Sequence, residues 1–154
     1  MRLIDELESL VHAFDVAGID YALCGGLAMA VHGHARATED IDILLREESL
    51  SEAIKAAVSV GFTFETGWLK FRDGTSEEQK LFRVLKPHSS GSLILDLLIV
   101  TPALEPVWNQ RQQFKRGDRS LSVVSSDGLI DMKRLSGRQR DLSDIERLTG
   151  ASDD

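Results

Sequence analysis

The sequence has only one cysteine, Cys24, among its 154 residues. A single cysteine excludes an intramolecular disulfide and a zinc site built from several cysteines, and it agrees with a reducing compartment. Long hydrophobic runs are also lacking, because no stretch approaches the roughly 20 apolar residues that span a bilayer. The opening residues include Asp5, Glu6 and Glu8, which is unlike a signal peptide. We therefore expect a cytoplasmic protein that has no membrane partner.

An excess of positive charge is lacking as well. The chain has 25 acidic and 18 basic residues and a formal net charge of −7, which argues against general affinity for nucleic acids. Two short basic runs, residues 111–119 and 133–140, are interpreted as solvated surfaces. Repeats, low-complexity tracts and long linkers are absent, and 42% of the residues are hydrophobic. This composition predicts a single domain over residues 1–154.

Acidic residues stand out where apolar strands are expected. Asp40 and Asp42 alternate with isoleucines, so their side chains share one face of a strand. Asp96 lies inside a second apolar strand, Leu93–Val100. Two carboxylates about 5 Å apart repel by roughly 3 kcal/mol at an effective dielectric near 20, so a cation is expected beside them. Hard ions such as Mg²⁺, with Mn²⁺ as an alternative, take oxygen ligands and share them with substrate phosphates, which favours phosphoryl or nucleotidyl chemistry.

A pair of glycines separates a short apolar strand, Tyr21–Cys24, from a helical stretch, Leu27–His32. Backbone amides of Gly25 and Gly26 can approach a phosphate closely, and the helix that follows favours negative charge there. Such a turn alone is more often purely structural. Combined with the later strand of Asp40 and Asp42 and with Asp96, it indicates a functional site.

Apolar periodicity and turn residues predict the remaining elements. Ser125 or Ser126 is a candidate cap for the first of two terminal helices. Asp73-Gly74 is expected to form a turn between strands of an antiparallel extension. The predicted helices are Leu3–Val16, Leu50–Val60, Asp127–Leu135 and Asp141–Leu148, and the further predicted strands are Asp40–Leu45, Phe62–Thr66, Trp68–Arg72, Leu81–Leu85 and Leu121–Val124.

Three segments together resemble the DNA polymerase beta-like nucleotidyltransferase superfamily, and within it the AbiEii-type and related minimal nucleotidyltransferases. They are Gly25-Gly26-Leu27-Ala28, Arg36-Ala37-Thr38-Glu39-Asp40-Ile41-Asp42 and residues 133–144, which end in Arg140-Asp141-Leu142-Ser143-Asp144. The resemblance implies an α/β (α+β) fold in which a small mixed β-sheet has helices packed on one face.

The same resemblance implies roles for particular residues. The residues implied to be catalytic and to bind Mg²⁺ are Asp40, Asp42 and Asp96. The residues implied to bind the nucleotide are Gly25, Gly26, Arg36 and Lys133. Helix-surface pairing explains Asp141 and Asp144 equally well. The superfamily often has Gly-Ser where this chain has Gly25-Gly26, so a hydroxyl that would hold a phosphate oxygen is missing.

The resemblance implies transfer of a nucleoside monophosphate from an NTP to a hydroxyl of a protein, an RNA or a small molecule. Membership of a toxin–antitoxin system is a narrower hypothesis. Because little sequence follows Asp144, the resemblance implies an acceptor site that is either contributed by a homodimer or a partner subunit, or absent. Two alternatives stay open: a non-catalytic module that binds a nucleotide or a protein, and an Mg²⁺-dependent phosphohydrolase.

Overall fold

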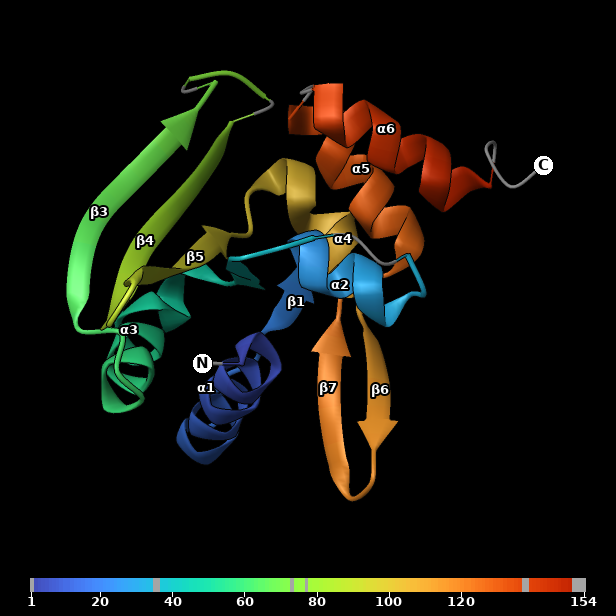
Figure 1. Ribbon diagram of the computed structural model, residues 1–154. Helices are drawn as coiled ribbons and strands as arrows, with labels where there is room; N and C mark the ends of the chain where they lie inside the picture. The colour runs from blue at the N-terminus through green and yellow to red at the C-terminus, as the bar shows by residue number, and fades with distance from the viewer. Residues whose placement is uncertain (1, 35–36, 73, 77, 137–138, 151–154) are drawn as a thin grey trace.

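A seven-stranded mixed sheet, with strand order β3-β4-β5-β2-β1-β7-β6, forms the centre of the computed structural model (Figure 1). Two strand pairs, β2–β5 and β1–β7, are parallel, and the others are antiparallel. The structure describes residues 2–34, 37–72, 74–76, 78–136 and 139–150. The strands are β1 (Ala22–Cys24), β2 (Ile41–Leu45), β3 (Phe64–Phe71), β4 (Gln79–His88), β5 (Gly91–Ile99), β6 (Gln112–Arg116) and β7 (Arg119–Val123).

The helices agree with the apolar periodicity. The first helix buries Leu7, Leu10 and Phe14 and ends at Gly18, whose φ of 71° is the left-handed conformation that favours glycine at this position. None of the helices in the described part of the chain is long and apolar enough to cross a membrane. The helices are α1 (Leu3–Ala17), α2 (Gly25–Val31), α3 (Leu50–Ser59), α4 (Glu105–Asn109), α5 (Ser126–Ser136) and α6 (Gln139–Thr149).

One face of the sheet carries the apolar core. Ile41 and Ile43 of β2 point to this face with Leu95 and Leu97 of β5, and all four are fully buried. Helices α1 and α3 lie side by side below the sheet in Figure 1. Lys86 of β4 also points to this face, where its ammonium group donates to Glu6 of α1 at 2.7 Å and to the carbonyl of Val60 after α3 at 3.1 Å.

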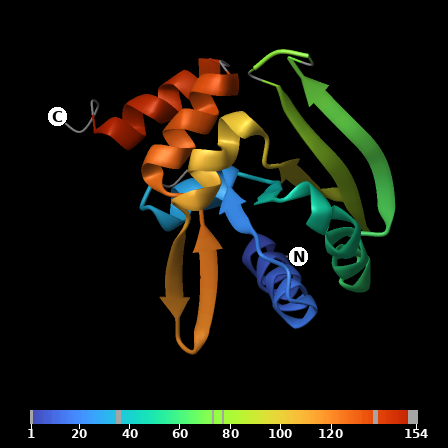
Figure 2. The same cartoon turned by 180° about the vertical axis from the view of Figure 1, so that it is seen from behind.

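The opposite face has polar side chains at its centre. Helices α5 and α6 stand on the other side of the sheet from α1 and α3, close to the end of β1, and the view from behind in Figure 2 shows the same division. The mixed α/β fold that the sequence predicted is confirmed, with α1 and α3 covering the apolar face of the sheet.

Several predicted boundaries need correction. Residues 64–71 form one strand, β3, rather than two, with an irregularity between Glu65 and Gly67 where the register against β4 shifts. Strand β6 was not predicted, because Phe114 is the only apolar residue of its Gln-Gln-Phe-Lys-Arg sequence. Helix α4 was missed because it has only five residues and contains Pro106, which lies in its first turn where the missing amide hydrogen costs nothing.

Candidate active site

Four residues form a row across four neighbouring strands. Cys24 of β1 lies opposite Asp42 of β2, Asp42 lies opposite Asp96 of β5, and Asp96 lies opposite Arg83 of β4. Cross-strand partners point to the same face of a sheet, so all four side chains are on the side opposite the apolar core. The sequence prediction that Asp42 and Asp96 come from adjacent strands and share a face is therefore correct. Asp40, two residues before Asp42, directly precedes β2 and is half-buried.

The carboxylate of Asp42 lies directly against the backbone of Gly25. Gly25 has a φ of +68°, and a Cβ built on it would lie 2.2 Å from Asp42 Oδ2 and 2.8 Å from Asp42 Cγ. Any side chain at this position would displace the carboxylate. The predicted glycine turn and the predicted Asp strand thus meet, although the chain enters α2 at Gly25 itself rather than after Gly26.

Arg83 occupies both carboxylate oxygens of Asp96. Its Nε donates to Oδ1 at 2.8 Å and its Nη2 donates to Oδ2 at 3.0 Å, which is a bidentate ion pair. The Asp96 side chain is only 8% exposed, whereas that of Arg83 is 33% exposed. Hydrogen bonding to Asp96 is the largest cause that raises the pKa of Arg83, and the charges of Asp40 and Asp42 add to it.

The sequence analysis did not single out Arg83, although a signal was present. Arg83 lies in the middle of Leu81-Phe82-Arg83-Val84-Leu85, an apolar strand with one charged residue, which is the same pattern that singled out Asp96. Repulsion between carboxylates predicted a nearby cation, and the structure supplies the guanidinium of Arg83 in that place. Among the described residues, no three His, Cys, Asp or Glu side chains are arranged to hold a metal ion. The carboxylate oxygens of Asp42 and Asp96 are nevertheless the type of ligand that Mg²⁺ prefers.

Lys133 of α5 is buried and bound to Asp144 of α6. Its Nζ lies 3.0 Å from Asp144 Oδ2, and the two side chains are 9% and 5% exposed. Lys133 also lies close enough to Cys24 for its charge to lower the pKa of that thiol. Lys133 therefore lies near the residue that precedes the glycine turn, and its implied role in nucleotide binding stays a prediction. Asp144 is a buried partner across two helices rather than a surface residue. The side chain of Asp141 and all of Arg36 lie outside the described residues.

Cys24 is a buried residue of the site, not a nucleophile. Burial raises its pKa well above the ordinary value, the charges of Asp42 and Asp96 raise it further, and Lys133 only partly offsets them. The thiol therefore stays protonated at neutral pH.

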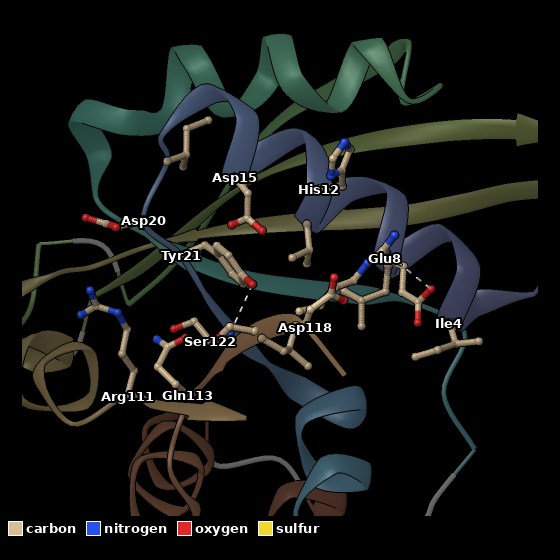
Figure 3. Close-up of a pocket in the computed structure, with 16 residues that line it drawn as sticks. Ile4, Glu8, His12, Asp15, Asp20, Tyr21, Arg111, Gln113, Asp118 and Ser122 are labelled. Carbon is tan, nitrogen blue, oxygen red and sulfur yellow. Dashed lines mark hydrogen bonds and ion pairs between the residues drawn. The ribbon is translucent and has the colours of Figure 1, made fainter. Parts of the chain in front are cut away.

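A groove of about 500 Å³ lies elsewhere, between α1 and the β6–β7 hairpin (Figure 3). Its walls carry Glu8, His12 and Asp15 from α1 and Arg111 and Gln113 from the hairpin side. Of the residues predicted to be catalytic or to bind nucleotide, those that the structure describes do not line this groove.

Comparison of the sequence with known protein families identifies the class of this protein, the nucleotidyltransferases. A sequence profile of the aminoglycoside-2''-adenylyltransferases matches residues 6–89, which is more than half of the chain and includes the glycine turn, Asp40, Asp42 and Arg83. The chain belongs to this family. No curated protein sequence matches it.

Solved structures share the fold at low sequence identity. A structure of ANT(2'')-Ia in complex with adenylyl-2''-tobramycin is 14% identical, with 95% of this chain and 86% of that chain covered and a TM-score of 0.58. A protein of Thermotoga maritima described as a nucleotidyltransferase is 15% identical. The match covers 98% of this chain and 96% of that chain, with a TM-score of 0.57. A Helicobacter pylori protein is 17% identical, with 96% and 65% covered and a TM-score of 0.56. A closer likeness to the AbiEii-type proteins stays a prediction.

Proposed function

We propose that the protein transfers a nucleoside monophosphate from an NTP to a hydroxyl acceptor in an Mg²⁺-dependent reaction at the row of Asp42 and Asp96. The observation that carries this proposal is the register of β2 and β5, which places the two carboxylates on one face, with Asp42 directly against Gly25. Membership of an adenylyltransferase family makes ATP the first donor to test.

Each residue has a distinct task in this proposal. Asp40, Asp42 and Asp96 would hold the metal, which would stabilise charge on the transferred phosphate and on the leaving pyrophosphate. In this proposal, Asp96 also accepts the proton of the attacking hydroxyl. The backbone at Gly25 and Gly26 is free of side chains and admits the triphosphate closely. Lys133 of α5, whose charge acts on Cys24 at the end of β1, would contribute positive charge on the phosphate side of the site.

The acceptor follows from the family and from a structural relative. The family description names the 2''-position of aminoglycosides, and the ANT(2'')-Ia structure contains adenylyl-2''-tobramycin. We therefore propose a small polyhydroxylated molecule as the first acceptor class to examine, with an aminoglycoside as the probe. A protein or RNA acceptor, as expected for a toxin, is the alternative, and growth arrest on expression would favour it.

The decisive experiment is incubation with each α-³²P-labelled NTP, Mg²⁺ and either tobramycin or a cell lysate. Label transferred to an acceptor together with released pyrophosphate supports the proposal, whereas release of inorganic phosphate alone indicates a phosphohydrolase. Asp42→Asn should lower the transfer rate by at least about a hundredfold. Asp131→Asn, which removes an exposed carboxylate of α5, is the matched control and should leave the rate unchanged.

A non-catalytic binding module is the second candidate, and the ion pair of Arg83 with Asp96 favours it, because that pair occupies both oxygens of the third carboxylate. Isothermal calorimetry with ATP and Mg²⁺ separates the two candidates. Binding without pyrophosphate release over the full set of acceptors would favour the module. Pyrophosphate release that Asp42→Asn abolishes would exclude it.

A further inference from the structure

We propose that the guanidinium of Arg83 competes with the metal ion for Asp96, and that nucleotide binding relieves this competition. Metal and nucleotide therefore bind cooperatively. This inference rests on the proposed function and adds a residue that the family resemblance did not name. It concerns how the site is loaded rather than which reaction it performs.

The competition follows from the geometry of the ion pair. Two nitrogen donors of Arg83 contact the two oxygens of Asp96 at 2.8 and 3.0 Å, so one lone pair of each oxygen is already used. A metal ion that takes Asp96 as a ligand therefore competes with these bonds, and it also meets the positive charge of the adjacent guanidinium. The displacement is costly, because hydrogen bonds between two charged groups are about twice as strong as neutral ones.

The arrangement of charge holds the guanidinium at the site while no metal is bound. Asp40 and Asp42 both act on Arg83 in addition to Asp96, so one cation faces three carboxylates. A metal ion that neutralises the carboxylates removes this attraction. The side chain of Arg83 is one-third exposed, while that of Asp96 is nearly buried, so the arginine is the partner that can move.

A nucleoside triphosphate offers the displaced guanidinium a new partner. Phosphate oxygens match the planar fork of arginine as well as a carboxylate does. Metal alone must break the Arg83–Asp96 pair without compensation, whereas metal bound with a triphosphate gives Arg83 an anionic partner at the same site. The two ligands should therefore bind more tightly together than separately, and the coupling should be reciprocal.

The experiment measures free Mn²⁺ by electron paramagnetic resonance during titration of the whole protein, with and without a non-hydrolysable ATP analogue. Arg83→Gln should bind Mn²⁺ alone at least about tenfold more tightly than the wild type, because the competing cation is gone. In the same variant, the gain in Mn²⁺ affinity on adding the analogue should shrink. Arg46→Gln is the matched control, since Arg46 makes a comparable two-bond contact with Glu105, and its Mn²⁺ affinity should equal that of the wild type.

A second measurement uses the wild type and so does not depend on the folding of a variant. The ¹⁵N–¹H signal of the Arg83 Nε should shift when Mg²⁺ and the analogue are added together, and should shift less when Mg²⁺ is added alone. Equal Mn²⁺ affinity of Arg83→Gln and wild type, or an Nε signal that is unchanged at saturation, overturns the inference while the proposed function stands. Failure of the wild type to bind Mn²⁺ even with nucleotide overturns the proposed function itself.

Discussion

Substitution of Gly25 by alanine tests the contact on which the site geometry depends. Gly25 and Gly18 have nearly equal backbone conformations, with φ values of 68° and 71°, but different surroundings. A Cβ on Gly25 would meet Oδ2, Cγ and Cβ of Asp42 at 2.2, 2.8 and 2.9 Å, whereas a Cβ on Gly18 would meet nothing within 4 Å. Gly18→Ala is therefore a control for the cost of the left-handed conformation alone.

The magnitudes separate the two variants. Both should lose about 1–2 kcal/mol of unfolding free energy, because an L-residue in the left-handed region is strained. Gly25→Ala should lose about 1–3 kcal/mol more, as in other overpacked sites, because the clash reaches Asp42 Cβ and cannot be relieved by rotating the far end of a side chain.

Urea denaturation of both variants, monitored by circular dichroism, measures the difference directly. Gly25→Ala should also abolish nucleotidyl transfer, since Asp42 is displaced, while Gly18→Ala should retain it. Equal losses of stability in the two variants would show that Asp42 does not contact the glycine turn, and the site as described would be wrong.

Three further predictions concern other contacts. Lys133→Met should destabilise the protein by about 3–5 kcal/mol because it leaves the buried Asp144 carboxylate unpaired, and a second change, Asp144→Leu, should recover much of the loss in a denaturation series. The pKa of Tyr21 is raised from 10.0 to about 12, chiefly by burial, so the absorbance titration of this single tyrosine should be centred well above pH 10. Because the unfolded state ionises first, stability should fall by about 1.4 kcal/mol per pH unit between pH 10 and about 12, and a midpoint near 10 would contradict the burial. Ser125→Ala should cost about 1 kcal/mol, because the Gly128 amide donates to Ser125 Oγ at 3.0 Å, whereas Ser126→Ala should cost under about 0.5 kcal/mol by the same assay.

Local sequence patterns predicted the parts of the site that depend on the alternation of side chains along a strand and on glycine turns. Asp42 and Asp96 were located because a charged residue in an apolar strand has few structural explanations, and Gly25 because it follows a strand and precedes a helix. Ser125 was one of two candidates for the cap, and the structure confirms it.

The partner of Asp96 was not predictable in the same way. Arg83 pairs with Asp96 only because β4 and β5 align these two residues, and that register follows from the hairpin between them rather than from either strand alone. The burial of Lys133 with Asp144 likewise depends on how α5 packs against α6, which the apolar periodicity of one helix does not specify.

The attachment of the β6–β7 hairpin to the sheet has a consequence for motion. Strand β1 has three residues, and its parallel pairing with β7 consists of Leu23 opposite Val123, followed by one bond from the Val124 amide to the Leu23 carbonyl at 2.9 Å. Next to this pairing, the Tyr21 hydroxyl accepts a hydrogen bond from the Ser122 amide of β7 at 3.2 Å. His32 also contacts the Val124 carbonyl and the Phe114 ring of β6, but the backbone pairing at this point is short. The amide hydrogens of the hairpin should therefore exchange with solvent before those of β2 and β5.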